Sequence, residues 1–255
     1  MKDHDEPALE RLARLIAGAA AGTRLASPPP ELVPATAADA FRVQSRVLAL
    51  LGTAAGAWKV GAKSPDAPIQ GAPIPATRVL PDGARLAAAD FHPLGLELEI
   101  AFVLGRAFPA RTQPYSTDEV LAGVSTLRAA IEIVASRFAA WPRVPPLLQL
   151  ADLQNNGALV LGDAVPYDPG FPFERPDASL RHGGHEVAKM PAANPAGDPR
   201  RLLAWLVNHR LASGEAVEAG SVITTGTFTG LHVSRDAAHV CGRIAGLPAV
   251  HLDIA

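Results

Sequence analysis

The stretch Leu94–Leu104, LGLELEIAFVL, has a large apolar residue at every second position. A period of two predicts a β-strand with two unlike faces. One face carries Glu97 and Glu99, whose side chains lie about 6.5 to 7 Å apart along such a strand. The opposite face has to pack into a hydrophobic core, and it consists of Leu96, Leu98, Ile100, Phe102 and Leu104. We therefore expect this strand to lie at the centre of the fold.

The two glutamates on one strand face have two interpretations. Like charges at this separation repel each other unless water screens them or a cation lies between them. Sites rich in carboxylate oxygen suit Mg²⁺ or Mn²⁺. The alternative is an ordinary strand on which Glu97 and Glu99 face solvent. The strand alone leaves both interpretations open.

The composition is that of a globular protein. The 255 residues are 48% hydrophobic and 19% charged, which is enough for one large core. A net charge of −2 without a lysine or arginine cluster predicts no nucleic-acid partner. The acidic N-terminus is unlike a signal peptide, and no apolar run approaches the ~18 residues of a membrane span, so we expect a cytoplasmic protein without a membrane partner. Cys241 is the only cysteine, which excludes an intramolecular disulfide and a CxxC motif.

Residues 1–55 are expected to form a small helical segment, and residues 56–255 the main domain. Two amphipathic patterns in the first segment begin at residues that favour helix starts, one of them a capping box, and the second pattern ends at a glycine. The residues that mark these ends are Asp5, Pro7, Thr36, Asp39 and Gly52.

The main domain is predicted to contain mostly short strands and few helices. Residues 58–61 form a strand, and the stretch from there to Leu80 is an extended loop. A capping box at Ser116 begins a helix through Leu127, and Pro199 begins another. Strands and helices that do not alternate as in βαβ units indicate an α+β fold. Further strands are expected within residues 130–134, 152–161, 219–230 and 240–254.

Glu132 is a single charge within an otherwise apolar strand pattern. Such a charge is costly to bury unless it is paired or binds a metal. The alternative is a strand residue that faces outward. Both interpretations stay open from the local sequence, in which the neighbours of Glu132 are Ile131, Ile133 and Val134.

Two other stretches resemble binding motifs superficially. His182 and His185 could hold a transition metal, but glycine-rich flanks without a third ligand nearby favour a surface loop. Gly56–Ser64 differs from a phosphate-binding loop because Ala62 separates the second glycine from the lysine. We therefore expect no nucleotide site here.

Four short motifs follow one another along the chain: Lys59-Val60-Gly61, Glu97-Leu98-Glu99, Glu132-Ile133-Val134 with Ser136-Arg137, and Gly226-Thr227-Phe228-Thr229-Gly230. Their order and approximate spacing resemble the fumarylacetoacetate hydrolase superfamily, and its 2-keto-4-pentenoate hydratase branch most closely. The resemblance covers most of residues 40–255. It implies a mixed β-roll core with an N-terminal helical segment, a homo-oligomer, and a hydratase of aromatic catabolism.

The resemblance also implies a site. Family carboxylates that bind Mg²⁺ or Mn²⁺ match Glu97, Glu99 and Glu132. Lys59 matches a lysine beside the substrate, where it could move a proton. Thr227 matches a threonine that contacts the substrate carboxylate, and Asn156 stands where hydratases have a small polar contact residue. The implied partner is a small 2-keto or 2-hydroxydienoic acid, which hydration converts into a 4-hydroxy-2-keto acid.

Two departures from the hydratase pattern bear on the addition of water. Ala135 stands where hydratases usually have an aspartate, and Ala72–Pro75 replaces a loop that usually carries another. If that aspartate activates water, hydration is in doubt while metal and enolate chemistry are unaffected. The alternatives are a 4-oxalocrotonate-type decarboxylase, a C–C bond hydrolase such as an acylpyruvate hydrolase, and a non-catalytic partner subunit that binds a 2-keto acid.

Overall fold

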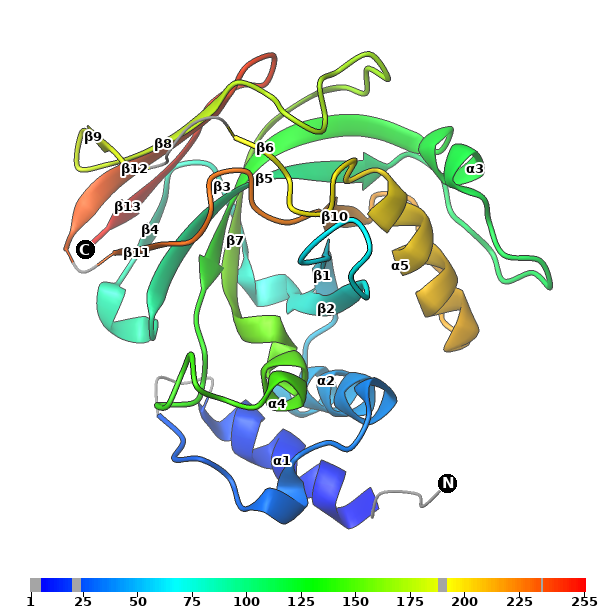
Figure 1. Ribbon diagram of the computed structural model, residues 1–255, viewed down its shortest axis with the longest axis vertical. Coiled ribbons are helices and arrows are strands. Elements are labelled where there is room, and N and C mark those ends of the chain that lie inside the picture. Colours follow the sequence, from blue (N-terminus) through cyan, green and yellow to red (C-terminus); the bar gives the residue numbers. More distant parts are fainter. Residues whose placement is uncertain (1–5, 20–23, 188–191, 235) are drawn as a thin grey trace.

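The structure is a computed structural model that describes residues 6–19, 24–187, 192–234 and 236–255. It confirms the expected α+β fold, in which a curled mixed sheet lies next to a smaller sheet and the N-terminal helices lie at one end (Figure 1). In the described part of the chain, no helix is both long and apolar enough to cross a membrane.

The larger sheet is built around β5, the strand that the alternating stretch predicts. From one edge to the other its strands are β2 (Gln70–Pro75), β1 (Ala55–Gly61), β10 (Val222–Thr224), β5 (Leu94–Leu104), β6 (Val124–Val134), β7 (Asn156–Pro166) and β3 (Val79–Pro81). β11 (His232–Ser234) pairs with the start of β5, on the edge that β10 also uses. The segment between β10 and β11 therefore runs along the middle of this edge of β5, where Phe228 N donates to Leu98 O at 2.8 Å.

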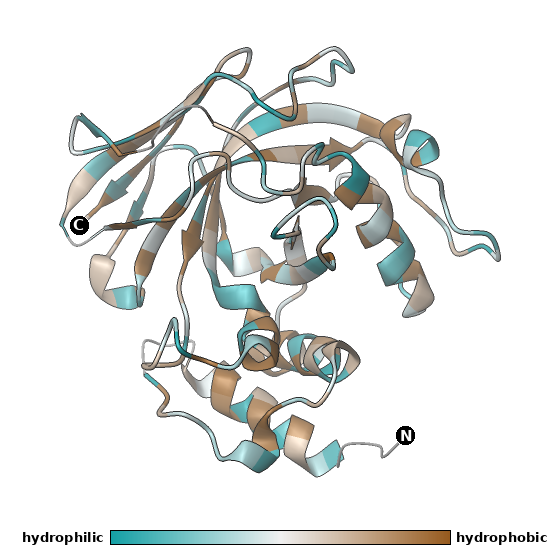
Figure 2. Ribbon diagram, viewed as in Figure 1, coloured by the Kyte–Doolittle hydropathy of each residue, from teal (hydrophilic) through white to brown (hydrophobic). Residues whose placement is uncertain are grey.

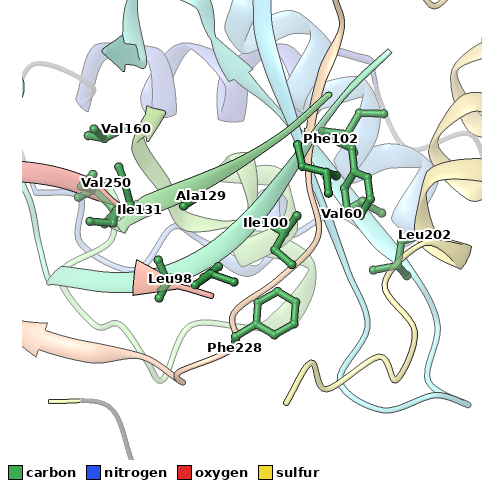
Figure 3. Close-up of a cluster of buried hydrophobic side chains, with 14 of the residues drawn as sticks. Val60, Leu98, Ile100, Phe102, Ala129, Ile131, Val160, Leu202, Phe228 and Val250 are labelled. Atoms are coloured by element: carbon green, nitrogen blue, oxygen red, sulfur yellow. The ribbon is translucent and has the colours of Figure 1, made fainter. Parts of the chain in front are cut away.

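The smaller sheet covers the apolar face of β5 and β6. Its strands are, in order, β4 (Ala84–Leu86), β13 (Val250–Ile254), β12 (Ala238–Ile244), β8 (Ala178–His182) and β9 (His185–Glu186). Figure 3 shows Leu98 and Ile100 of β5 in the same cluster as Val250 of β13. Burial of each such side chain stabilises the fold by roughly 1.5–3 kcal/mol. A β-carbon at Gly242 would lie 2.5 Å from Leu98 Cδ1, so a larger residue there would force the Leu98 side chain to shift.

The N-terminal helices α1 (Glu6–Ala19) and α2 (Ala37–Leu51) share a second apolar cluster with α4 (Pro146–Ala151). Hydrophobic and hydrophilic residues both occur along α1, as expected for a helix with one buried face (Figure 2). The expected capping box of α2 is present, with Asp39 N donating to Thr36 Oγ1 at 3.1 Å. Because α4 belongs to the main domain, the helical segment packs directly onto it, and the division at residue 55 stays a prediction.

The remaining helices are short, apart from α5. They are α3 (Thr117–Leu121), α5 (Arg201–Ala212) and the 3₁₀ turns Pro30–Leu32, Ala76–Arg78, Ala88–Asp90 and Leu153–Asn155. The helix predicted from Ser116 through Leu127 is wrong in its length. The capping box at Ser116 is present, but α3 ends at Leu121 and β6 already begins at Val124. Residues 124–127 pair with the far end of β5, and this tertiary pairing outweighs their local helical pattern.

Two stretches predicted as loops contain strands. The segment that leads to Leu80 holds β2 and β3. Both are edge strands, where a proline can be tolerated because its missing N–H need not join a ladder. His182 and His185 face each other in the β8–β9 hairpin instead of lying in a loop.

Candidate active site

Three glutamates from two adjacent strands meet on the sheet face opposite the core of Figure 3. Glu97 and Glu99 project from β5, and Glu132 on β6 lies directly opposite Glu97 in the strand register. One carboxylate oxygen from each residue lies within 4.8 Å of the other two. Glu99 is 1% exposed and Glu132 0% exposed. The solvent-facing interpretation is therefore wrong for Glu99 and Glu132.

Lys59 of β1 reaches this carboxylate cluster from across the sheet. Its Nζ forms an ion pair with Glu132 Oε1 and donates a hydrogen bond to Gln154 O at 3.2 Å. Burial lowers the pKa of Lys59, but the three carboxylates raise it by more, so the net pKa lies above its usual value. The side chain is therefore a protonated ammonium.

Crowding raises the pKa values of two of the carboxylates as well, and for a carboxylate this favours the neutral form. Burial, with repulsion from Glu132, raises the pKa of Glu97 to about 7. Burial also raises the pKa of Glu99 well above its usual value, and repulsion from Glu132 and Glu97 adds to that effect. One ammonium group does not offset the effects of burial and of repulsion between the carboxylates, so the site lacks positive charge.

The donor set fits a divalent cation. Three carboxylates face a single ammonium, and Glu132 Oε2 is buried with no hydrogen-bond partner among the described residues. An unsatisfied buried polar group costs roughly 1–3 kcal/mol of stability, and a charged group costs more. Mg²⁺ and Mn²⁺ prefer carboxylate oxygens, and such an ion would supply both the missing charge and the missing partner. Glu97, Glu99 and Glu132 are the residues that would hold it.

The turn after β10 supports Glu99 from a different direction. Gly226 N donates to Glu99 Oε2 at 2.8 Å, and its φ of +87° is one that glycine adopts readily. The Asn194 side-chain amide donates to Thr225 O at 2.8 Å and to Gly226 O at 3.3 Å. Asn194 escaped the sequence analysis because no local pattern links it to a turn about 30 residues later.

Thr227 lies in this same turn. Its Oγ1 donates to Gly230 O at 3.3 Å and accepts from Thr229 N at 3.2 Å. These bonds close the turn on itself, and the role of Thr227 toward a substrate carboxylate stays a prediction.

Asn156 lies beside the carboxylates. Its Nδ2 donates to Glu132 Oε1 at 3.0 Å, while its Oδ1 is buried without a partner among the described residues. The three residues before it are left-handed although none is glycine, with φ of 48°, 52° and 57° at Leu153, Gln154 and Asn155. Such a conformation costs roughly 1–2 kcal/mol per residue. This strained conformation directs the Gln154 carbonyl toward Lys59.

A buried ion pair anchors this left-handed turn. Asp152 accepts hydrogen bonds from Ser136 Oγ at 3.0 Å and Arg137 N at 2.9 Å, and its other carboxylate oxygen lies 3.1 Å from Arg137 Nε. Burial raises the pKa of Asp152 even though Arg137 opposes the shift. The sequence offers Asp152, with Asp66 and His182, as a candidate for the group that activates water, and that role stays a prediction.

The structure also shows the two places where the sequence departs from the hydratase pattern. Ala135 is buried. Ala72–Pro75 are the last four residues of β2, and all four are buried. Neither place carries a carboxyl group, so neither supplies an acid that could activate water.

Residues 48–251 match the family described as fumarylacetoacetate (FAA) hydrolase, C-terminal. The chain belongs to the fumarylacetoacetate hydrolase family. This match confirms the resemblance drawn from the four motifs, and with it the fold that the resemblance implied.

Curated proteins similar to this member of the family are hydratases. The 2-keto-4-pentenoate hydratase of Paraburkholderia xenovorans (strain LB400) is 30% identical over 148 residues, which cover 58% of this chain and 54% of that protein. The 2-keto-4-pentenoate hydratase 1 of Dechloromonas aromatica (strain RCB) is 25% identical over 154 residues, 58% of this chain and 55% of that protein. The chain thus spans about half the length of the curated relatives it matches.

Solved structures of the fumarylacetoacetate hydrolase type share the fold. The 4-oxalocrotonate decarboxylase from Pseudomonas putida G7, complexed with magnesium and adipate, has a TM-score of 0.86 at 19% identity over 98% of both chains. The fumarylpyruvate hydrolase from Pseudomonas aeruginosa, in complex with Mn²⁺ and pyruvate, has a TM-score of 0.60 at 15% identity over 78% of this chain and 88% of that chain. At such identities the likeness is one of fold.

Proposed function

We propose that the protein is a metal-dependent hydratase that adds water to a 2-hydroxy-2,4-dienoic acid of the 2-keto-4-pentenoate type. The observation that carries the proposal is the buried cluster of Glu97, Glu99 and Glu132 in contact with Lys59. The hydratases at 24–30% identity support the same reaction class.

The chemistry follows from the charges in the site. A 2-keto acid has two adjacent oxygens that suit a divalent cation, and Mg²⁺ or Mn²⁺ held by Glu97, Glu99 and Glu132 would stabilise negative charge that develops on them. Lys59, protonated at rest, donates a proton to C5 as the dienol becomes the keto form. The remaining C3–C4 double bond is then conjugated with the keto group, so water adds at C4 and C3 takes up a proton. Glu132 and the Gln154 carbonyl fix the orientation of its ammonium group.

Decarboxylation of a 4-oxalocrotonate-type diacid is the second candidate. The lack of a carboxyl group at Ala135 and in Ala72–Pro75 favours it. Hydration needs a group within about 2.6–3.2 Å of the attacking water, or one further water away. Ala135 and Ala72–Pro75 provide none. Loss of CO₂ requires only that the resulting enolate be stabilised.

Product analysis by NMR in D₂O distinguishes these candidates. The protein is incubated with Mg²⁺ and either 2-hydroxypenta-2,4-dienoate or 2-oxohex-3-enedioate, with Glu99→Gln as the inactive control. We expect 4-hydroxy-2-oxopentanoate from the first compound. CO₂ release from the diacid alone favours the decarboxylase. Cleavage of an acylpyruvate, supplied in a third incubation, favours the C–C hydrolase. Exchange at C3 without any product contradicts an enzymatic role and supports a non-catalytic subunit.

A further inference from the structure

A cavity of about 290 Å³ lies at the ends of β6 and β7, next to the carboxylate cluster. Part of its wall comes from α1 and the end of α2, which lie below this end of the sheet in Figure 1. Asn156 joins the cavity to the cluster, because it lines the cavity and its Nδ2 lies 3.0 Å from Glu132 Oε1. The cavity has room for water beside a small organic group.

The side-chain oxygen of Asn156 lacks a hydrogen-bond donor. A carboxylate such as that of Glu132 accepts hydrogen bonds, so the amide atom that faces it is Nδ2, and Oδ1 faces a different direction. Asn156 is 1% exposed, and its Oδ1 is buried with no partner among the described residues. Buried acceptors of this kind are usually satisfied by a protein donor or by an ordered water molecule. This oxygen therefore marks a place where a water molecule can be held.

His92 lines the same cavity from the segment that precedes β5. Its main-chain oxygen accepts from Ser136 N at 2.6 Å, which ties it to the end of β6. The preceding Phe91 packs against the start of β7, since a β-carbon at Gly157 would lie 2.9 Å from Phe91 Cδ1. His92 and Asn156 are thus the chain neighbours of two residues that pack together. The imidazole of His92 is half-buried, and it has no hydrogen bond or ion pair within the described residues.

The lining of the cavity offers few groups that can take a proton from water. Arg24, Arg78 and Arg137 stay protonated, as arginines do in proteins, and Asp90 is exposed to solvent. A neutral imidazole is the proton acceptor that enzymes use most often. His92 is therefore the lining residue best suited to activate water.

The three residues that the sequence offers for this role are placed less well. Asp66 is exposed. His182 Nε2 lies 2.7 Å from Ser234 Oγ, and His182 belongs to the smaller sheet. Asp152 is buried in its ion pair with Arg137. None of the three is among the described residues that line the cavity.

We propose that His92 takes the proton of the water that adds to C4, while Asn156 Oδ1 accepts the other hydrogen of the same water. The inference rests on the proposed function and supplies the group that its second step lacks. The water oxygen forms a bond to C4, the π electrons of the C3–C4 bond move toward the C2 oxygen, and the released proton goes to the imidazole. C3 then takes up a proton and the imidazolium loses one, so the net change is the addition of water.

The test follows the two steps of the reaction separately. 2-Oxopent-3-enoate requires only the addition of water, whereas 2-hydroxypenta-2,4-dienoate must first take up a proton at C5. Both are incubated with the Mg²⁺-loaded protein in D₂O and followed by NMR. We expect His92→Gln and His92→Ala to slow formation of 4-hydroxy-2-oxopentanoate from either compound about 100-fold or more. Uptake of deuterium at C5 and the affinity for Mg²⁺ should be unchanged, so 2-oxopent-3-enoate accumulates from the dienol.

Two further measurements distinguish proton transfer from a structural role. Imidazole added to His92→Ala should restore part of the water addition, because it can occupy the space that the ring leaves. Calorimetry should show that 4-hydroxy-2-oxopentanoate binds more tightly than 2-oxopentanoate, and that His92→Ala removes part of this difference. His209→Gln is the matched control and should behave as the wild type, since the His209 ring is also half-buried but stacks on Trp205 at 4.7 Å, outside the cavity.

Failure of this inference and failure of the proposed function give different results. If the wild-type protein adds water and His92→Gln does so at the same rate, the assignment of His92 is overturned and the proposed function stands. Parallel losses of water addition, C5 deuteration and Mg²⁺ affinity in the His92 variants show a structural role and also overturn the assignment. Absence of water addition by the wild-type protein overturns the proposed function, and the assignment of His92 with it.

Discussion

Lys59 and Glu132 form an ion pair inside the protein although 73 positions separate them in the chain. Glu132 is fully buried, and the side chain of Lys59 is 12% exposed. Breaking such a pair from one side leaves a buried charge without its partner, which is more costly than the pair itself is stabilising.

Replacing Lys59 should therefore destabilise the metal-free protein. We expect Lys59→Met to lower the free energy of unfolding by about 3 kcal/mol at pH 8, as for other broken buried pairs. Added Mn²⁺ should recover part of the loss, because the cation supplies positive charge to the same carboxylates. Urea denaturation with EDTA and with Mn²⁺ measures both effects. Lys63→Met, at an exposed position nearby, is the control, and equal stability of the two variants contradicts the prediction.

Replacing one carboxylate should separate metal binding from folding. We expect Glu99→Gln to weaken Mn²⁺ binding by at least tenfold, since the ion loses a charged ligand. Stability without metal should rise or stay unchanged, because repulsion within the cluster is relieved. Calorimetry and thermal denaturation report the two quantities, with Glu218→Gln at an exposed position as the control. Unchanged Mn²⁺ affinity in Glu99→Gln would remove the residue from the metal site.

The pKa of Glu97 predicts how stability depends on pH. Because the pKa is raised from 4.5 to about 7 in the folded protein, the folded state retains a proton that the unfolded state releases. Stability without metal should therefore decrease as the pH rises from about 4.5 to about 7, and Mn²⁺ affinity should increase over the same range as the carboxylate ionises. Urea midpoints in EDTA at a series of pH values measure the slope. Glu97→Gln should have a smaller slope, and an identical one counts against the assignment.

Asn194 should act on the metal site through the Gly226 turn. We expect Asn194→Ala to lower stability by about 1–2 kcal/mol, because two carbonyl groups lose their donor, and to weaken Mn²⁺ binding several-fold through Glu99. Asn208→Ala is a closely matched control, since Asn208 bridges both main-chain groups of Tyr115 at 2.8 and 2.9 Å. It should lose similar stability without a change in Mn²⁺ affinity. Equal Mn²⁺ affinities in the two variants would make the role of Asn194 purely structural.

The expected homo-oligomer is a separate prediction. The apolar face of α1 does not support it, because Leu12 and Ile16 are buried against the other helices of the same chain. The expectation therefore rests on the family resemblance alone. Light scattering at micromolar concentration decides it, and a monomeric mass refutes it.

The sequence predicted what depends on local periodicity. The alternation in Leu94–Leu104 specified β5 and the face that carries Glu97 and Glu99, and an isolated charge in an apolar strand drew attention to Glu132. What it did not predict depends on contacts between distant segments. The edge strand β2 and the Asn194 amide become neighbours of the site only after the chain folds.

The group that contacts Lys59 at the left-handed turn is a main-chain carbonyl, so it is present whatever side chain occupies position 154. Replacement there keeps the carbonyl and changes the cost of holding φ near 52°: glycine lowers this cost, and proline forbids the conformation. Alanine scanning of side chains would therefore overlook this partner of Lys59. Sequence variation at position 154 would not indicate its loss, since the backbone path rather than residue identity preserves the contact.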